Sequence, residues 1–329
     1  MAATPTPDAR PAAAGDARIR VRLDAVRRVA EGVHTFELRR PDGAPLPEWA
    51  PGAHVDLHLP NGLTRQYSLC GDPDDRSCWT VGVKRDPASR GGSAWMFERL
   101  RVGETLDAGG PRNLFPLDEQ ARTSVLIAGG IGVTPLVAMA ERLAALGRDW
   151  SMTYAVRRRA EAAFAERLTR HGTRVRLHVD EAHGGRPVDV AALVAAAPAD
   201  AQLYCCGPAP MLDAFESAAA ARPRGRVHVE RFTAAAAPAT AGGYVVELAR
   251  SGRRVHVSPG QTIVDALRTI GVDVAVSCAQ GICGTCETRV LAGVPEHRDS
   301  LLSDAERAAN DVMMICCSGS LTGALTLDL

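Results

Sequence analysis

The feature that most restricts the fold of this chain is a short loop with three closely spaced cysteines. Cys278, Cys283 and Cys286 lie in the stretch SCAQGICGTCETRV with a C-x4-C-x2-C spacing. Structural zinc sites usually take their cysteines from two C-x2-4-C pairs. A C-x4-C-x2-C loop with a distant fourth cysteine is instead the pattern of plant-type [2Fe–2S] ferredoxins. The spacing therefore predicts an iron–sulfur cluster, with a structural zinc knot or unliganded thiols as the alternative.

The fourth ligand has to come from further along the chain, where Cys316 and Cys317 stand side by side. Residues 287–315 separate Cys316 from the loop, which suits the distant thiolate of the plant-type pattern. Neighbouring side chains on an extended strand point to opposite faces, so only one of the two can be a ligand. We predict that Cys316 is the ligand and that Cys317 is a small buried residue.

The sequence divides into three folded parts. Short strand-like runs broken by Pro, Gly and Asp predict an antiparallel β-barrel over residues 17–116. Apolar runs that alternate with helical patterns predict an α/β domain with a parallel sheet over residues 117–233. Residues 234–242 resemble a linker. Residues 243–329, with a hairpin and a short amphipathic helix before the cysteines, predict a β-grasp ferredoxin.

A cluster accepts one electron at a time, whereas metabolic reductants deliver two as a hydride, so a cofactor such as flavin has to lie between them. The barrel offers Arg65, Tyr67 and Ser68 in the run RQYS. We expect Arg65 to meet a phosphate, Tyr67 to pack on the isoalloxazine or ribityl group, and Ser68 to hydrogen-bond the ring.

Further along the barrel, the run RGGS contains Arg90, Gly92 and Ser93. Its backbone donors and its hydroxyl are suited to binding an anion. Each of the two runs alone is an ordinary strand or turn. Their combination on one barrel predicts a flavin site.

Two stretches of the α/β part are suited to a dinucleotide. AGGIGVTP, which contains Gly130 and Gly132, closes a predicted strand and opens a helix, and its glycines allow a tight turn close to a ligand. It departs from the strict G-x-G-x-x-G fingerprint. Cys206 ends another apolar run at the same carboxyl edge of the sheet, where open α/β sheets bind ligands. Its neighbour Cys205 is expected to be a core thiol.

The order of these motifs resembles that of phthalate dioxygenase reductase-type proteins, relatives of vanillate O-demethylase reductase components. The resemblance runs from about residue 17 to the C-terminus and rests on RQYSL, RGGS, GGIGVTP, CCGPAPM, HVERF, the cysteine loop and MMICCS. It implies an FMN barrel, an NADH domain and a C-terminal [2Fe–2S] ferredoxin. FMN is implied rather than FAD because related FAD enzymes commonly carry the ferredoxin at the N-terminus. Cys70, after the flavin motif, and Gly319, where a basic residue is common, are small departures.

The resemblance also implies roles for individual residues. The residues implied to hold FMN are Arg65, Tyr67, Ser68, Gly92 and Ser93, and those implied to line the nicotinamide nucleotide site are Gly130, Gly132 and Cys206. Thr134 would lie near the flavin N5 region, and Phe232 would cover the ring at the domain junction. Thr134 and Cys206 are therefore the candidate catalytic residues, in a hydride transfer that needs fixed geometry rather than a general acid or base.

Composition and termini narrow the function further. The formal net charge is zero and aromatic residues make up only 4% of the chain, which leaves no electrostatic or stacking footprint for nucleic acid. The N-terminal stretch lacks the apolar core of a signal peptide. No window offers the roughly 18 apolar residues that a membrane span needs. We therefore expect a cytoplasmic monomer whose cysteines serve metals or catalysis.

Two other groups of residues could be read as binding sites. His54 and His58 lie four apart in a β-rich stretch, where the i, i+4 metal pair of a helix does not form, so they are expected to be ordinary strand residues. Arg157, Arg158 and Arg159 form either a solvated loop or a contact to an adenosine ribose or 2′-phosphate, which would admit NADPH.

Together these features predict the reductase component of a multicomponent, Rieske-type oxygenase or O-demethylase. It would pass electrons from NADH through FMN and a [2Fe–2S] cluster to the terminal oxygenase in a transient complex. Two other functions stay open: a reductase for a cytochrome P450 or another one-electron acceptor, and a non-enzymatic metal-binding or redox-sensing protein with a degenerate flavin domain. The intact flavin and nucleotide motifs argue against the second.

Overall fold

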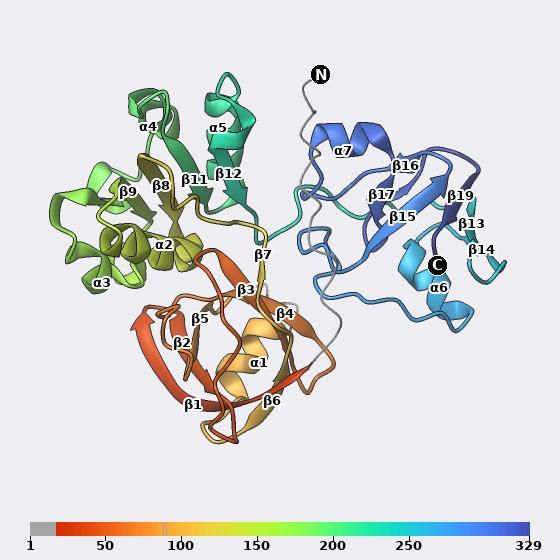
Figure 1. Ribbon diagram of the computed structural model, residues 1–329, viewed down its shortest axis with the longest axis horizontal. Coiled ribbons are helices and arrows are strands. Elements are labelled where there is room, and N and C mark those ends of the chain that lie inside the picture. The colour runs from red at the N-terminus through yellow and green to blue at the C-terminus, as the bar shows by residue number, and fades with distance from the viewer. Residues whose placement is uncertain (1–17, 88, 90) are drawn as a thin grey trace, which may run out of the picture.

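The structure, a computed structural model, describes residues 18–87, 89 and 91–329 and forms three lobes. Figure 1 shows a barrel at the bottom, an α/β lobe at the upper left and a strand-rich lobe at the upper right. The chain builds them in that order and passes from the second to the third through an extended segment. The predicted fold class is confirmed.

The barrel lobe is one antiparallel sheet that closes on itself. Burial alternates along β6, whereas β3 is buried over almost its whole length, and the inner faces of the strands enclose an apolar core that includes Phe36, Leu57 and Trp79. The elements are β1 (Ile19–Ala30), β2 (Val33–Arg39), β3 (Ala53–His58), β4 (Thr64–Ser68), β5 (Trp79–Lys84), α1 (Gly92–Glu98), β6 (Thr105–Ala108) and β7 (Arg112–Asn113). The strand order is β4-β3-β6-β1-β2-β5, with β7 paired to β3, and a bridge between Leu69 and Val81 joins the two edges.

The α/β lobe has a parallel sheet in the order β10-β9-β8-β11-β12. Its strands are β8 (Thr123–Gly129), β9 (Asp149–Val156), β10 (Val175–Val179), β11 (Gln202–Cys206) and β12 (Val227–Glu230). Its helices are α2 (Val133–Ala145), α3 (Ala165–Thr169), α4 (Val190–Ala196) and α5 (Ala209–Ala219), with short 3-10 turns η1 (Gly130–Gly132), η2 (Arg159–Glu161), η3 (Gly172–Arg174), η4 (Asp180–His183) and η5 (Arg224–Arg226). Along β8, Leu126 and Ala128 pack with α2 while Ile127 packs with α4 and α5, so helices cover both faces.

The ferredoxin-like lobe mixes parallel and antiparallel strands in the order β14-β13-β19-β15-β17. β13 (Tyr244–Leu248) and β14 (Arg254–Val257) form the predicted hairpin, and β13 runs parallel to β19 (Ala324–Leu327). The remaining elements are α6 (Ile263–Thr269), β15 (Glu287–Ala292), β16 (Pro295–Glu296), α7 (Asp304–Ala309), β17 (Val312–Met314) and β18 (Gly319–Ser320). A capping box between Thr262 and Asp265 starts α6, which leads toward the cysteine loop.

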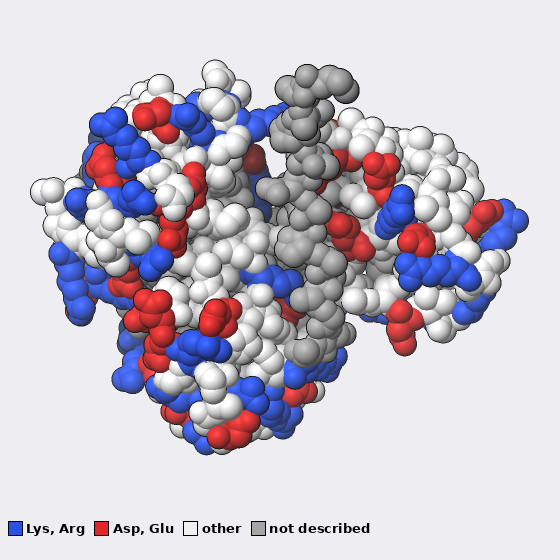
Figure 2. Space-filling model, viewed as in Figure 1, with Lys and Arg blue, Asp and Glu red and all other residues white. Residues whose placement is uncertain are grey.

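On the face shown in Figure 2, charged side chains are spread rather than concentrated in one patch. Figure 2 shows basic and acidic side chains interspersed over all three lobes on the face in view. This distribution agrees with the zero formal net charge of the whole chain. Within the described residues, no helix is both long and apolar enough to cross a membrane.

Candidate functional site

A cavity of about 410 Å³ lies where the three lobes meet. Clefts of this size that combine apolar walls with a few polar groups are typical small-molecule sites. The predicted site residues that line it are Arg65, Tyr67, Ser68, Ser93, Thr134, Phe232 and Cys278. Five separate stretches of sequence, from all three lobes, are thus brought to one cavity by the fold.

Several buried polar atoms of the cavity wall have no hydrogen-bond partner among the residues that the structure describes. Nε2 of His54, Oγ of Ser68 and Oε2 of Glu230 are buried without a hydrogen bond, and all three residues line the cavity. Leaving such an atom unsatisfied costs roughly 1–3 kcal/mol, and native proteins rarely do so. The wall therefore offers donors and acceptors to a polar ligand. A flavin, with an apolar ring system and polar nitrogen and oxygen atoms along it, suits this mixture.

The two predicted flavin motifs lie against each other. A Cβ on Gly92 would come within 2.6 Å of Arg65 Nε, so the arginine side chain lies directly over the start of α1 and would have to shift if a larger residue replaced the glycine. Ser93, the next residue, donates from Oγ to Ser89 Oγ at 3.1 Å, and both serines line the cavity. Arg90 lies outside the described residues. One corner of the cavity thus combines a guanidinium with two hydroxyls, a set suited to a phosphate.

β4 carries the other residues of the first flavin motif. Burial raises the pKa of Tyr67 to about 12, although nearby Arg65 opposes the shift. The phenol therefore stays protonated at neutral pH and can donate a hydrogen bond. Ser68 is buried at the end of the same strand.

Thr134 stands at the contact between the barrel and α/β lobes. It is the second residue of α2, and its Oγ1 donates to the backbone oxygen of Ile131 at 2.9 Å. Its methyl group lies so close to Gly82 of β5 that a Cβ there would be 2.6 Å away. Because Thr134, Ile131 and Gly82 all line the cavity, this tight contact sets the distance between two of its walls.

The glycine-rich turn packs on the end of a neighbouring strand. A Cβ on Gly132 would lie 2.3 Å from the backbone oxygen of Cys206, the last residue of β11, and Gly130 adopts a left-handed conformation (φ 53°). The Cys206 thiol is fully buried, and burial raises its pKa well above the ordinary value. The structure thus places the backbone of Cys206 against the turn and its thiol in the core, away from the cavity wall. Cys205 packs on the opposite face of the sheet.

The strand β12 contributes a residue that sequence reasoning missed. Glu230 ends this strand, and Phe232 follows it as an exposed aromatic side chain on the cavity wall. Burial raises the pKa of Glu230 to about 8, so its carboxyl group is mostly protonated at neutral pH. The available signal was its position, since a polar residue that ends a parallel strand lies at the edge where ligands bind.

Lys84 is a second residue that was missed. It ends β5 and lines the cavity, with its ammonium 3.8 Å from a carboxylate oxygen of Glu161. It is also the only lysine of the chain, since all the other residues among the 38 Lys and Arg are arginines. Counting the lysines separately would have drawn attention to it.

His54 was expected to be an ordinary strand residue, and it does lie on β3 with His58. Its buried ring nevertheless lines the cavity. Burial, with a smaller contribution from Arg112, lowers the pKa of His54 to about 4, so the ring is neutral at pH 7. His58 instead bonds through Nδ1 to Thr64 at 2.9 Å.

The arginine run at the end of β9 is partly accounted for by ion pairs. Arg158 contacts Glu31 of the barrel lobe at 3.0 Å and Glu161 at 2.9 Å. Arg157 and Arg159 are exposed. The structure therefore uses one of the three to join two lobes.

The four predicted cluster ligands are buried and arranged in pairs. The thiol of Cys278 raises the pKa of Cys283, and that of Cys316 raises the pKa of Cys286 and lowers that of its neighbour Cys317. Within the part of the chain that the structure describes, no three His, Cys, Asp or Glu side chains converge closely enough to hold one metal ion. Two pairs of thiols suit the two irons of a [2Fe–2S] cluster.

Cys317, the neighbour of the proposed fourth ligand Cys316, lies in a turn and not in the extended strand that was expected. β17 ends at Met314, and residues 315–317 form a turn in which Cys317 N donates to Met314 O at 3.2 Å. The premise of an extended strand was therefore wrong. The turn directs the Cys317 thiol toward Gly281 of the cysteine loop, where a Cβ would be only 2.4 Å from its sulfur.

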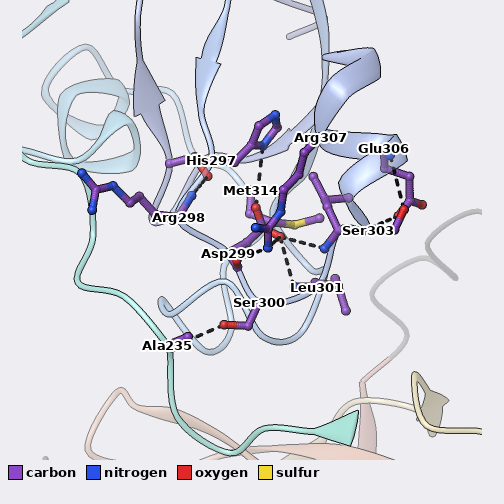
Figure 3. A network of polar contacts seen from close by, with 12 residues as sticks. Ala235, His297, Arg298, Asp299, Ser300, Leu301, Ser303, Glu306, Arg307 and Met314 are labelled. Carbon is purple, nitrogen blue, oxygen red and sulfur yellow. Dashed lines mark hydrogen bonds and ion pairs between the residues drawn. The ribbon is translucent and has the colours of Figure 1, made fainter. Parts of the chain in front are cut away.

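A network of polar contacts surrounds Asp299 and Arg307 (Figure 3). It lies next to the cysteine loop, where Ser300 N donates to the backbone oxygen of Gly281 at 2.9 Å. The carboxylate of Asp299 is fully buried and accepts hydrogen bonds from Leu301 N at 3.0 Å and Leu302 N at 2.7 Å. Arg307 donates to the backbone oxygen of the same residue at 2.6 Å. A Cβ on Gly281 would lie 2.8 Å from Asp299 Cα, so this network packs directly on the loop.

Comparison with known proteins supports the cluster assignment and covers the whole chain. Residues 246–319 match the 2Fe-2S iron-sulfur cluster binding domain. The chain is 53% identical to phenoxybenzoate dioxygenase subunit beta of Ectopseudomonas oleovorans, over 97% of this chain and 99% of that protein. It is 43% identical to vanillate O-demethylase oxidoreductase of Pseudomonas sp. (strain HR199 / DSM 7063), over 94% and 100%.

Solved structures share the three-lobed arrangement. An intact type IV self-sufficient cytochrome P450 monooxygenase matches with a TM-score of 0.85 and 40% identity, over 98% of this chain but only 43% of its own. This chain thus spans less than half of that protein. Phthalate dioxygenase reductase, described as a modular structure for electron transfer from pyridine nucleotides to [2Fe–2S], matches with a TM-score of 0.73 and 34% identity, over 95% and 98%.

Proposed function

The chain belongs to the family of phthalate dioxygenase reductase-type flavin/iron–sulfur oxidoreductases, and we propose that it passes electrons from NADH through FMN and one [2Fe–2S] cluster to a terminal oxygenase. It is thus a reductase component of a multicomponent oxygenase or O-demethylase, as the names of its relatives indicate for those proteins. The observation that carries the proposal is the single cavity whose wall includes Tyr67, Thr134 and Cys278, one from each lobe.

The barrel lobe would bind the flavin. Arg65 and Ser93 would take the phosphate, Tyr67 would pack on the ring system, and Ser68 and His54 would pair their unsatisfied atoms with its polar edge. We propose FMN because the corner formed by Arg65 and Ser93 suits one terminal phosphate. When bound, the flavin supplies the conversion of a two-electron hydride transfer into two one-electron transfers.

The α/β lobe would present the nicotinamide. The turn with Gly130 and Gly132 would take the nucleotide at the carboxyl edge of the sheet, with the backbone of Cys206 against it. Thr134 would hold the nicotinamide side of the cavity at a fixed distance from the barrel, and Phe232 would cover the ring from water. Hydride transfer then depends on positioning by these side chains. NADH is proposed over NADPH, since Arg158 is already engaged by two carboxylates.

The ferredoxin-like lobe would hold the cluster. We propose that Cys278 and Cys283 bind one iron and that Cys286 and Cys316 bind the other, in keeping with their pairwise contacts. Cys278 lines the cavity, so the cluster would approach the flavin on that side. Docking on the terminal oxygenase would be transient, because an electron carrier has to bind, transfer and leave, and the protein would act as a monomer.

A reductase for a cytochrome P450 is the second candidate. It is favoured by the structural match to a self-sufficient P450 monooxygenase, in which a region like this chain belongs to the same polypeptide. The two functions share the electron path from NADH to the cluster and differ in the acceptor.

The purified full-length protein tests the shared path. It should contain one FMN for two irons and two acid-labile sulfides, the inorganic content of one [2Fe–2S] centre, and NADH should reduce cytochrome c faster than NADPH does. FAD after acid release would overturn the FMN assignment, and zinc in place of iron would overturn the cluster. Reconstitution with a Rieske-type oxygenase or a P450, each scored by product formation, separates the two acceptors.

A further inference from the structure

A hydrogen bond links the barrel lobe to the start of the cysteine loop. Oγ of Ser277 donates to Oδ1 of Asp56 on β3 at 3.1 Å. Ser277 immediately precedes Cys278, which is both a cavity residue and a proposed cluster ligand. The contact therefore ties the barrel to the residue next to that ligand.

Asp56 is rigidly held for this contact. Arg112 of β7 donates from Nη1 to Oδ2 at 2.8 Å and from Nη2 to Oδ1 at 2.9 Å. This is a bidentate ion pair, and the Asp56 side chain is only 6% exposed. Burial opposes its ionisation, but the hydrogen bonds and charge of Arg112 outweigh burial and lower the pKa of Asp56. A carboxylate gripped at both oxygens cannot rotate without losing charge-assisted bonds, so its direction toward Ser277 is fixed.

Stability alone does not account for this ion pair. Removing two charges from water opposes their attraction, so a buried pair contributes little net stability and apolar residues of similar volume could replace it. The Arg112 guanidinium also lies within electrostatic reach of the Cys283 and Cys278 sulfurs. The pair thus occupies the junction between the flavin cavity and the cysteine loop.

We propose that Asp56, held by Arg112, is a positioning residue that anchors the cysteine loop through Ser277 and so fixes the separation between flavin and cluster. This inference rests on the proposed function. Each transfer moves one electron from the reduced flavin to the cluster, which oxidises the flavin and reduces the cluster by one equivalent, and the flavin protons pass to water. Electron transfer weakens steeply with distance, so a looser anchor slows this step and leaves hydride transfer from NADH unchanged.

Rapid mixing of the cofactor-loaded, full-length protein with NADH tests the anchor, with flavin and cluster absorption followed separately. Ser277→Ala should slow cluster reduction severalfold, because the loop that loses its hydrogen bond to Asp56 can move away from the barrel. The rate of flavin reduction and the KM for NADH should stay at wild-type values. Ser277→Thr, which keeps the hydroxyl, should restore cluster reduction.

Amide hydrogen exchange gives a second readout that does not depend on activity. In the protein that holds its flavin and cluster, without NADH, the backbone amides of residues 278–282 should exchange about tenfold faster in Ser277→Ala than in the wild type. Exchange in β13 and β19, the centre of the ferredoxin-like sheet, should not change. A loss of protection over the whole lobe would mean general destabilisation and would overturn a local anchor.

Asp304→Asn is a matched control, because it removes a different contact of the same lobe. Asp304 pairs with Arg224 of the α/β lobe at 2.5 Å, and both side chains are about three-quarters exposed, so this pair should contribute little. Wild-type cluster reduction in Ser277→Ala, or an equal slowing in Asp304→Asn, would overturn the inference. If NADH does not reduce the flavin of the wild-type protein, the proposed function is refuted. The hydrogen-exchange experiment would still decide whether Ser277 anchors the cysteine loop.

Discussion

Gly281→Ala is the substitution in the cysteine loop whose effect the structure defines most sharply. Gly281 adopts a φ of +67°, and an alanine Cβ there would lie 2.4 Å from the sulfur of Cys317 and 2.8 Å from Cα of Asp299. Neither neighbour can move away easily. Cys317 belongs to the buried turn after β17, and the Asp299 contact is with backbone that the polar network of Figure 3 holds in place.

Two effects add up at this position. An L-residue in the left-handed region costs roughly 1–2 kcal/mol, and forcing an extra methyl group into a packed site costs about 1–3 kcal/mol. The sum is a loss of about 2–5 kcal/mol for the cluster-binding conformation. Because small domains are stable by only about 5–15 kcal/mol, such a loss should leave the ferredoxin-like lobe short of its cluster.

Gly284→Ala separates the two effects within the same loop. Gly284 also has a positive φ, +74°, but the nearest atom to its Cβ is Cδ2 of Leu301 at 3.2 Å, the mobile end of a side chain. Only the backbone strain of roughly 1–2 kcal/mol applies there. The steric contribution of about 1–3 kcal/mol is therefore the expected difference between the two variants.

The assay combines cofactor content with stability. Iron, acid-labile sulfide and flavin are measured in both variants, and the denaturant midpoint of cluster loss is followed by visible absorption. Gly281→Ala should lose most of its iron and keep its flavin, whereas Gly284→Ala should keep both with a lower midpoint. If the two variants lose the cluster equally, the close packing of Cys317 and Asp299 on Gly281 has no energetic consequence and the reasoning fails.

Cys316→Ser should remove the cluster and leave the flavin bound, whereas Cys317→Ser should keep the cluster absorption; the reverse result in visible spectra and iron analysis would assign the fourth ligand to Cys317. An amine-reactive ester should modify Lys84 as the only ε-amine of the chain, and NADH should protect it because it lines the cavity. Equal modification with and without NADH, measured on the Lys84 peptide by mass spectrometry, would exclude Lys84 from the nucleotide site. For Glu230, burial raises the pKa from 4.5 to about 8, so between these values the folded protein retains a proton that the unfolded chain has released. The stability of the cofactor-free wild type relative to Glu230→Gln should therefore fall as pH rises from 5 to 8, by up to about 1.4 kcal/mol per unit, and parallel urea midpoints for the two proteins over this range would contradict it.

Residues with a fixed spacing were the easiest to predict from the sequence. The cysteine loop has few geometric solutions, so its spacing alone indicated the cluster, and the match to a 2Fe-2S domain agrees. The strand–turn–helix pattern around Gly130 and Gly132 likewise predicted the β8–η1–α2 unit that the structure contains. In both cases the local chain dictates the geometry, so no tertiary information was needed.

Residues whose importance depends on tertiary contacts were not predicted. Glu230 and His54 look like ordinary strand residues, and only the meeting of the lobes buries their unpaired atoms in one wall. Cys317 is buried as predicted, but residues 315–317 form a turn where an extended strand was expected.

The cavity also explains why the individual flavin and nucleotide motifs are weak when read alone. Gly82 needs its small size because Thr134 of another lobe packs on it, and Gly92 needs it because Arg65 crosses over it. The close neighbour of each glycine thus comes from a distant part of the sequence, and the motif alone contains only the glycine. A substitution at Gly82 would change the distance between the barrel wall and the α/β wall of the cavity. In the proposed hydride transfer, the geometry would therefore depend on the contact between the lobes, which local sequence motifs do not describe.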